Sequence, residues 1–274
     1  MEKSDTALLG GGRMISVRLT LSHWRIAAMN ELQYWANFFV QIIHSALSLA
    51  VGLVAIWLVF DHTTDLGGWT APELLAVMGV HVLVGGLLKT LIEPNMRRLM
   101  DDVQEGTYDY VLTKPVDAQL LTSIREVKPW HAVDIVLGFG VLTYAVIDLG
   151  RTFDVGAALL FAVTLTAGTI MIYCVWIMIT STAFRVVRSD EVLNLFDGFY
   201  QTGRWPISIY PFWLSGVLTF IIPLAFAVTV PAEAVSGRLN PNTVALAVVF
   251  CVVLALVTRR VWAINLRHYS GASA

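Results

Sequence analysis

Long apolar stretches alternate with shorter polar segments along the whole chain. A helix that spans a membrane needs about 20 mainly apolar residues, because each residue rises about 1.5 Å and the hydrocarbon layer is about 30 Å thick. The sequence meets this requirement in six places, and we expect spans at about 37–60, 73–92, 130–149, 154–182, 207–231 and 240–260. The fifth stretch contains or adjoins Pro206, Pro211, Pro223 and Pro231, so we expect it to be broken or kinked.

The composition agrees with a chain that lies in lipid. Of the 274 residues, 57% are hydrophobic and 14% are charged, whereas soluble domains carry about 45–50% apolar and about 25% charged residues. We therefore expect an all-α integral membrane protein with a single domain over 1–274. The net charge of −2 gives no reason to expect a nucleic-acid partner. Cys174 and Cys251 fall inside spans, where we expect them to be small apolar core residues.

Basic residues gather on one side of the predicted membrane. Of the 18 Lys and Arg residues, 16 fall in the amino-terminal segment, after the second or fourth span, or at the carboxyl end. The other two are Arg151 and Arg238. Because Lys and Arg are retained on the cytoplasmic side, we expect both termini in the cytoplasm. Segment 185–204 is then a cytoplasmic helix, either a solvated connector or a second docking surface.

The amino-terminal segment has an amphipathic pattern over 14–31. Its apolar residues recur at helical spacing and are accompanied by two arginines: Val17, Leu21, Trp24 and Ala28, with Arg18 and Arg25. This pattern predicts a basic amphipathic helix in the headgroup region of the membrane. The helix either anchors the amino end only or also contacts a partner. The first 30 residues lack the apolar core of a signal peptide.

The segment 93–129, between the second and third spans, is far longer than a turn requires. Four apolar residues continue the helical period of the second span: Met96, Leu99, Met100 and Val103. We therefore expect that helix to extend beyond the membrane. Gly106 is a natural stop, since glycine has no Cβ to resist a left-handed conformation. Asp117 is placed to cap a further short helix, and Pro129 to open the third span.

A short helix is expected between Gly106 and Asp117. Residues 107–112 suffice for one or two helical turns, which end at Lys114-Pro115. Held away from the membrane, such a helix would expose Tyr108, Tyr110 and Leu112. Exposed aromatic and aliphatic side chains favour contact with a partner. The alternative is a solvated connecting loop.

The run from Asp102 to Leu120, DVQEGTYDYVLTKPVDAQL, resembles the cytoplasmic signature of ABC-2 type transporter permeases. The resemblance implies a six-span permease subunit of an ATP-binding cassette exporter, similar to type V exporters. It also implies pairing with a second copy or a related six-span permease around a central pathway, and docking of a separate ATPase subunit. Carried over by position, seven residues would couple the permease to the ATPase: Glu105, Gly106, Thr107, Tyr108, Leu112, Pro115 and Val116.

No ATP site is encoded in this sequence. The glycine-rich run that begins at Gly85 lacks the spacing of a phosphate-binding loop and lies inside a predicted span. We therefore expect no cofactor on this chain, with ATP and Mg²⁺ on the partner ATPase, and no catalytic activity of its own. The expected location is the cell membrane of a prokaryote, crossed several times.

Few ionisable side chains fall inside the predicted spans. His44, His81 and Asp134 are candidates to line a transport pathway, since such groups are costly in lipid. The alternative is that the histidines form hydrogen bonds to neighbouring helices and that Asp134 lies near the membrane interface. A competing hypothesis for the whole chain is a secondary transporter or channel that works without ATP. A third is a membrane scaffold that recruits partners through the 93–129 segment.

Overall fold

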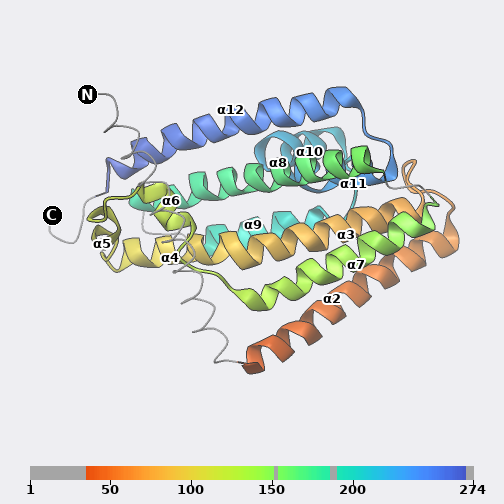
Figure 1. Ribbon diagram of the computed structural model, residues 1–274, viewed down its shortest axis with the longest axis horizontal. Helices are drawn as coiled ribbons and strands as arrows, with labels where there is room; N and C mark the ends of the chain where they lie inside the picture. The colour runs from red at the N-terminus through yellow and green to blue at the C-terminus, as the bar shows by residue number, and fades with distance from the viewer. Residues whose placement is uncertain (1–34, 151–153, 186–189, 270–274) are drawn as a thin grey trace, which may run out of the picture.

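The computed structural model describes residues 35–150, 154–185 and 190–269 (Figure 1). Within these ranges the regular structure is helical, apart from one isolated bridge between Leu66 and Trp69. The long helices lie side by side along one axis, as Figure 1 shows. The prediction of an all-helical membrane protein is confirmed. The amphipathic helix predicted over 14–31 lies outside the described residues.

Five helical segments in the described ranges are long and apolar enough to cross a membrane. They are built on the helices α2 (Trp35–His62), α3 (Ala71–Leu87), α7 (Ala132–Asp148), α8 (Val155–Thr180) and α12 (Pro241–Leu266). Short 3₁₀ turns extend two of them, η2 (Pro129–His131) before α7 and η3 (Ser181–Phe184) after α8. These helices lie where five of the six spans are expected.

The second span continues well beyond the length that a membrane requires. The helix α3 passes through one π-helical segment, η1 (Leu88–Ile92), into α4 (Glu93–Gln104), so that Ala71–Gln104 forms one run of 34 residues. This run is the centre of the fold, because 67% of its most apolar stretch is buried, against 11–33% for the other four spans. The expected helical extension is therefore present.

Glycines let α7 approach α3 closely. A Cβ built on Gly138 would lie 2.5 Å from the backbone nitrogen of Leu83, and one built on Gly86 would lie 2.7 Å from the backbone nitrogen of Ile135. Backbone atoms cannot move aside as a flexible side chain can, so only glycine fits at these positions. The same holds for Gly168 of α8, whose added Cβ would lie 2.4 Å from the Cα of Ala227.

The stretch expected as the fifth span is a bent pair of helical segments. Its first half is α10 (Phe212–Gly216) with η5 (Val217–Ile221), and its second half is η6 (Ala225–Thr229) with α11 (Val230–Ser236). The halves meet at 77°. Pro223 lies at the break, where a proline cannot donate a helical hydrogen bond. The predicted break is confirmed.

Both ends of the bent pair lie beside the same end of α3. Before it, Trp69 Nε1 donates a hydrogen bond to Ser208 Oγ at 3.0 Å, next to the 3₁₀ turn η4 (Ile207–Ile209). After it, Arg238 donates to the carbonyl oxygen of Gly68 at 2.6 Å and to Glu73 at 2.9 Å. The pair thus enters and leaves at one end of the bundle, which is the geometry of a re-entrant loop rather than a straight span.

The helix α9 (Asp190–Thr202) and the residues after it run alongside α4, α3 and α2. They lead from the end of the bundle near α4 toward the end at which the bent pair begins. Asp197 lies 3.9 Å from Arg97 of α4, whereas Tyr200 donates a hydrogen bond to the carbonyl oxygen of His81 in α3. Arg204 then donates to Ser48, halfway along α2, at 3.3 Å. The expectation that 185–204 lies wholly in the cytoplasm, with Arg204 among its basic residues, is therefore wrong. Hydropathy does not separate a short helix buried among spans from one outside them.

Candidate functional site

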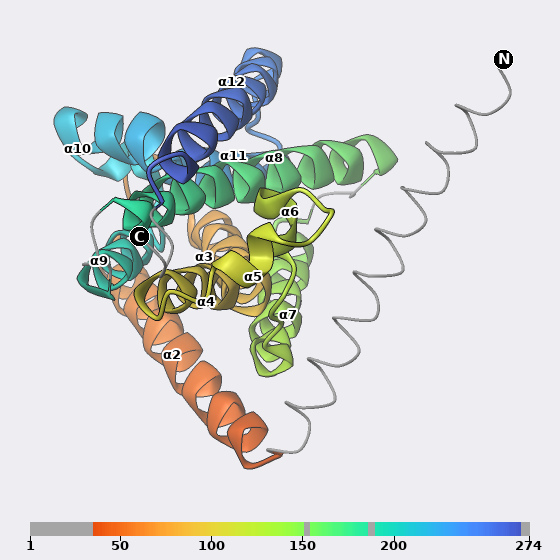
Figure 2. The same ribbon diagram turned by 90° about the vertical axis from the view of Figure 1, so that its left-hand side faces the viewer.

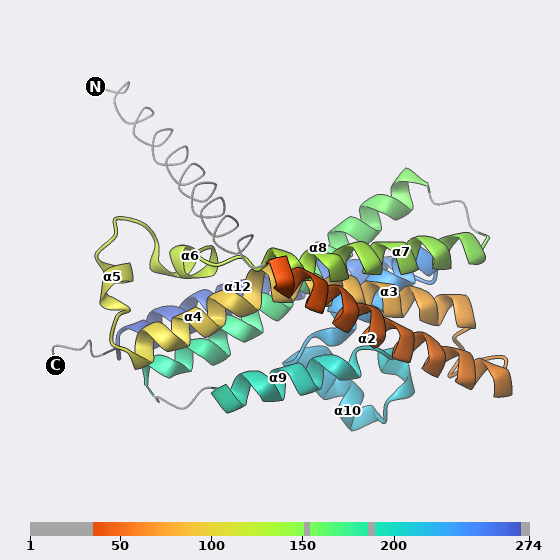
Figure 3. The ribbon, with the colours of Figure 1, turned by 90° about the horizontal axis from the view of Figure 1, so that it is seen from below.

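The candidate site lies at the end of the bundle where α4, α5 (Asp109–Leu112) and α6 (Ala118–Ser123) gather. Figure 2 shows this end facing the viewer, and Figure 3 shows α5 projecting beyond the nearby ends of α2 and α7. The predicted coupling element, 105–116, belongs to this projection. We call it the α5 projection, defined as residues 105–123.

A glycine turn directs the chain out of α4. Gly106 has a φ of 70°, the left-handed region in which a side chain is strained. The carbonyl oxygen of Asp102 then accepts backbone hydrogen bonds from Thr107 at 2.8 Å and from Tyr108 at 3.0 Å. The turn thereby satisfies a carbonyl group that the end of a helix leaves free. The prediction that Gly106 ends the extended helix is confirmed.

A buried carboxylate fixes the base of the projection. The side chain of Asp102 is 2% exposed and accepts a hydrogen bond from Arg98 Nε at 3.0 Å. Its other oxygen accepts from Arg125, which lies beyond α6 in the sequence. Thr107 Oγ1 adds a third contact at 3.3 Å. Because an unpaired buried charge is costly, Asp102 holds both ends of the projection together.

Tyr108 lies inside the projection rather than on its surface. Its side chain is fully buried, so the expectation that it is exposed is wrong. Its hydroxyl group lies 3.0 Å from Thr122 Oγ1, and its ring packs 5.1 Å from Phe184 and 5.6 Å from Tyr269 between ring centroids. Burial is also the main reason that the pKa of Tyr108 is raised to about 12. Tyr108 therefore anchors the projection to the ends of the spans.

The outer side of the projection carries exposed apolar groups. Tyr110 is 74% exposed, Leu112 is 41% exposed and Leu120 is 46% exposed. Pro115 is also exposed, and Val116 is partly buried. This face projects from the end of the bundle, where it is available to another protein. Tyr110 and Leu112 are exposed as expected.

The helix α6 is tied to two further spans. Asp117 caps α6 as predicted, since its side chain accepts a hydrogen bond from the backbone nitrogen of Leu120 at 3.0 Å. The same carboxylate forms an ion pair with Arg259 of α12 and accepts a hydrogen bond from its guanidinium group. The hydrogen bond from Arg259 is the main reason that the pKa of Asp117 is lowered. Ser123 lies 2.8 Å from the hydroxyl group of Tyr173 in α8. The projection is thus in direct contact with α4, α8 and α12.

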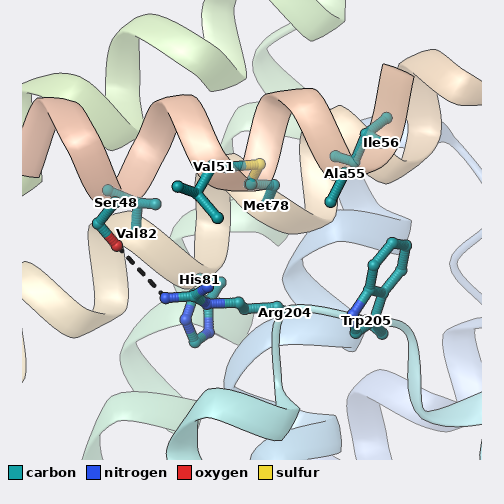
Figure 4. A pocket seen from close by; sticks show the side chains of 10 residues that line it. Ser48, Val51, Ala55, Ile56, Met78, His81, Val82, Arg204 and Trp205 are labelled. Atoms are coloured by element: carbon teal, nitrogen blue, oxygen red, sulfur yellow. Dashed lines mark hydrogen bonds between the residues drawn. The ribbon is translucent and has the colours of Figure 1, made fainter. Parts of the chain in front are cut away.

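The three candidate pathway residues do not form one cluster. His44 is exposed on α2, whereas Asp134 is partly buried near Gln41 at 3.2 Å and His131 at 3.6 Å. His81 is buried and lines a cavity of about 110 Å³ between α2 and α3 (Figure 4). Neither His44 nor Asp134 lines that cavity. Over the described ranges, His, Cys, Asp and Glu side chains form no group of three that could hold a metal ion.

Three residues that make important contacts in the structure were not identified as candidates from the sequence. Asp102 had a local signal, because Arg98 precedes it by one helical turn and i,i+4 pairs of opposite charge interact. Arg259 had none, because its partner Asp117 is 142 positions away. Arg204 was placed outside the membrane by its position after the fourth span.

Comparison with known protein families agrees with this architecture. The model of the ABC-2 family transporter proteins matches residues 46–273, which is most of the chain. The protein therefore belongs to the ABC-2 transporter membrane family, whose members are permease subunits of ATP-binding cassette transporters. Searches of the curated proteins and of the solved structures find no significant match to the chain.

Proposed function

We propose that this permease docks a separate ATPase subunit through the outer face of the α5 projection and works as an exporter. The observation that carries the proposal is the contrast between the two sides of this projection. Its inner side is bound to the spans by Tyr108, Asp102 and Asp117, while its outer side exposes Tyr110 and Leu112. A rigid element with a free apolar face suits a lever that passes ATPase movement to the spans.

The distribution of charge supports a cytoplasmic location for the projection. Figure 1 shows α4, α5, α6 and the carboxyl end of α12 at this end of the bundle. Basic residues lie in or directly beside these elements: Arg98 in α4, Lys114 in the projection, Arg125 paired with Asp102, and Arg260 in α12. Arg238 lies at the opposite end, beside Glu73. Since Lys and Arg favour the cytoplasmic side, this arrangement supports cytoplasmic termini and contact with a soluble ATPase. The corresponding location is the inner membrane of a prokaryotic cell.

The permease would act with a second six-span subunit, either another copy or a related chain. Large apolar side chains remain exposed along α2, at spacings that place them on one face: Leu47, Val51, Val54 and Leu58. Lipid or a second permease would cover such a face. ATP and Mg²⁺ would bind to the ATPase, which would supply the energy for transport.

The experiment is co-purification of the tagged permease with the ABC ATPase subunits expressed in the same cells. The double variant Tyr110→Ala, Leu112→Ala removes exposed side chains and leaves the buried anchors in place. We expect it to insert normally and to lose most of the bound ATPase. Tyr144→Ala is the matched control, because Tyr144 is 61% exposed but lies on α7. Full recovery of the ATPase with the double variant would contradict the proposal.

A further inference from the structure

The cavity between α2 and α3 has apolar walls and one charged end. Its apolar lining includes Val51, Ala55, Ile56, Met78 and Val82, and Trp205 closes one side. Val51 is 64% exposed, so the cavity reaches the outer surface of α2. Figure 4 shows Ser48, His81 and Arg204 together at the other side of the cavity.

Arg204 carries a positive charge into this cavity without a negative partner. Its guanidinium group donates one side-chain hydrogen bond, to Ser48 Oγ at 3.3 Å. Among the residues that the structure describes, it forms no ion pair with a carboxylate. A guanidinium group has five N–H donors, and Ser48 lies halfway along α2. A charge at this depth of a membrane is costly unless something compensates it.

His81 lies beside Arg204 and forms part of the wall of the same cavity. The side chain is buried, at 5% exposure. Its Nδ1 atom is covered by protein near Gly203 and has no hydrogen-bond partner within the described part of the chain. The ring of Tyr200 stacks on it at 4.6 Å, and the hydroxyl group of Tyr200 donates to the carbonyl oxygen of His81 at 2.6 Å. The imidazole ring is thus held in a fixed position next to the guanidinium group of Arg204.

We infer that Arg204 and Ser48, with His81 as the adjoining wall, bind the anionic head group, phosphate or carboxylate, of an amphiphilic molecule. The planar fork of arginine matches the oxygens of both groups. A cavity of about 110 Å³ is smaller than the roughly 150 Å³ that encloses a benzene molecule. It therefore accepts a head group, while the apolar chain of the ligand lies outside it, along Leu47, Val51 and Val54 of α2. This binding needs no ATPase, so it is tested separately from the proposed docking.

The test measures binding of dodecyl phosphate to the full-length permease by native mass spectrometry in a zwitterionic detergent. We expect one saturable adduct per chain, and no such adduct with dodecyltrimethylammonium. Arg204→Gln should weaken binding of dodecyl phosphate about tenfold or more, because charge-assisted hydrogen bonds are lost. Arg204→Lys keeps the positive charge but lacks the planar guanidinium group. Its affinity for dodecyl phosphate should lie between those of the natural chain and Arg204→Gln. Arg260→Gln is the matched control, since Arg260 is exposed at the end of α12, and should bind as the natural chain does.

A second variant covers the case in which Arg204→Gln does not fold. Val51→Trp places a large side chain at the exposed mouth of the cavity without changing any charge. We expect it to weaken the binding of dodecyl phosphate as well. Competition with phosphatidylglycerol then distinguishes the two sources of the head group. Displacement of dodecyl phosphate assigns the site to a membrane phospholipid, and persistence assigns it to a single-chain molecule.

Equal binding by the natural chain, Arg204→Gln and Val51→Trp would overturn the inference. It would also be overturned if Arg204→Gln kept its affinity for dodecyl phosphate but no longer paired with a second permease. In that case the missing negative charge would come from the neighbouring subunit rather than from a ligand.

Discussion

The hydroxyl group of Tyr108, the residue directly before α5, lies 3.0 Å from Oγ1 of Thr122 in α6. Both side chains are buried, so neither has water as a substitute partner. Two residues beyond Tyr108, the side chain of Tyr110 is 74% exposed. The short helix α5 thus begins after an inner residue that holds it in place, and it carries an outer residue available to a partner.

The first prediction concerns this anchor. Tyr108→Phe keeps the ring against Phe184 and Tyr269 but leaves the hydroxyl group of Thr122 without its partner, which should cost about 1–2 kcal/mol of unfolding free energy. Tyr108→Ala also empties the ring site and should cost about 3–5 kcal/mol. Thermal unfolding of the purified variants measures both effects. Equal stability of the two variants would show that the ring adds nothing.

The second prediction concerns Asp102. Asp102→Asn leaves Arg98 and Arg125 without their negative partner and should destabilise the protein by about 1–3 kcal/mol. The loss is smaller than for a fully buried pair, because both arginine side chains are partly exposed, at 46% and 22%. Limited proteolysis of the α5 projection should become faster. Unchanged proteolysis and unchanged unfolding would mean that Asp102 does not hold the projection.

The third prediction tests the close packing of α3 against α7. Gly138→Ala places a Cβ 2.5 Å from the backbone nitrogen of Leu83, so the helices must separate, at a cost of about 1–3 kcal/mol. Gly140→Ala is the matched control on the same helix, because nothing lies within 4 Å of its added Cβ. It should be neutral or stabilise the helix by up to about 1 kcal/mol. The reverse order of stability would show that α7 is packed differently.

The fourth prediction follows from the lowered pKa of Asp117. A carboxyl group whose pKa is lower in the folded protein stabilises the fold above its unfolded pKa, and this contribution is lost as the pH falls through the folded pKa. Asp117→Asn keeps a good helix cap but removes the ion pair with Arg259. Its melting temperature should therefore be slightly below that of the natural chain at neutral pH. The effect is small, since the two side chains are 39% and 55% exposed.

The two melting temperatures should converge when the pH falls below the lowered pKa of Asp117, because the carboxyl group is then neutral in both states. A constant difference across this range would contradict a role for the ion pair.

Local features of the projection could be predicted from the sequence because they depend on neighbouring residues. Gly106 ends a helix by its own conformational freedom, and Asp117 caps α6 through the backbone of Leu120, three positions away. The burial of Tyr108 could not be predicted in this way. Its ring contacts come from Phe184 and Tyr269, which lie far along the chain.

The fifth apolar stretch shows a second limit of sequence reasoning. A bent re-entrant pair and a straight span have the same hydropathy, since both are surrounded by lipid and other helices. The prolines predicted the break, but only the contacts of Ser208 with Trp69 and of Arg238 with Glu73 show that both ends lie at one side. The position of Arg204 beside the middle of α2 depends on the same arrangement. It could not be predicted from the residues around Arg204 in the sequence.

The most direct test of the docking claim is site-specific photocrosslinking at Tyr110. A benzoylphenylalanine residue replaces Tyr110 in one variant and Tyr144 of α7 in another, and both are expressed with the ATPase subunit. We expect a crosslinked product between permease and ATPase from position 110 and none from position 144. A crosslink from both positions, or from neither while the two subunits still co-purify, would contradict the docking claim.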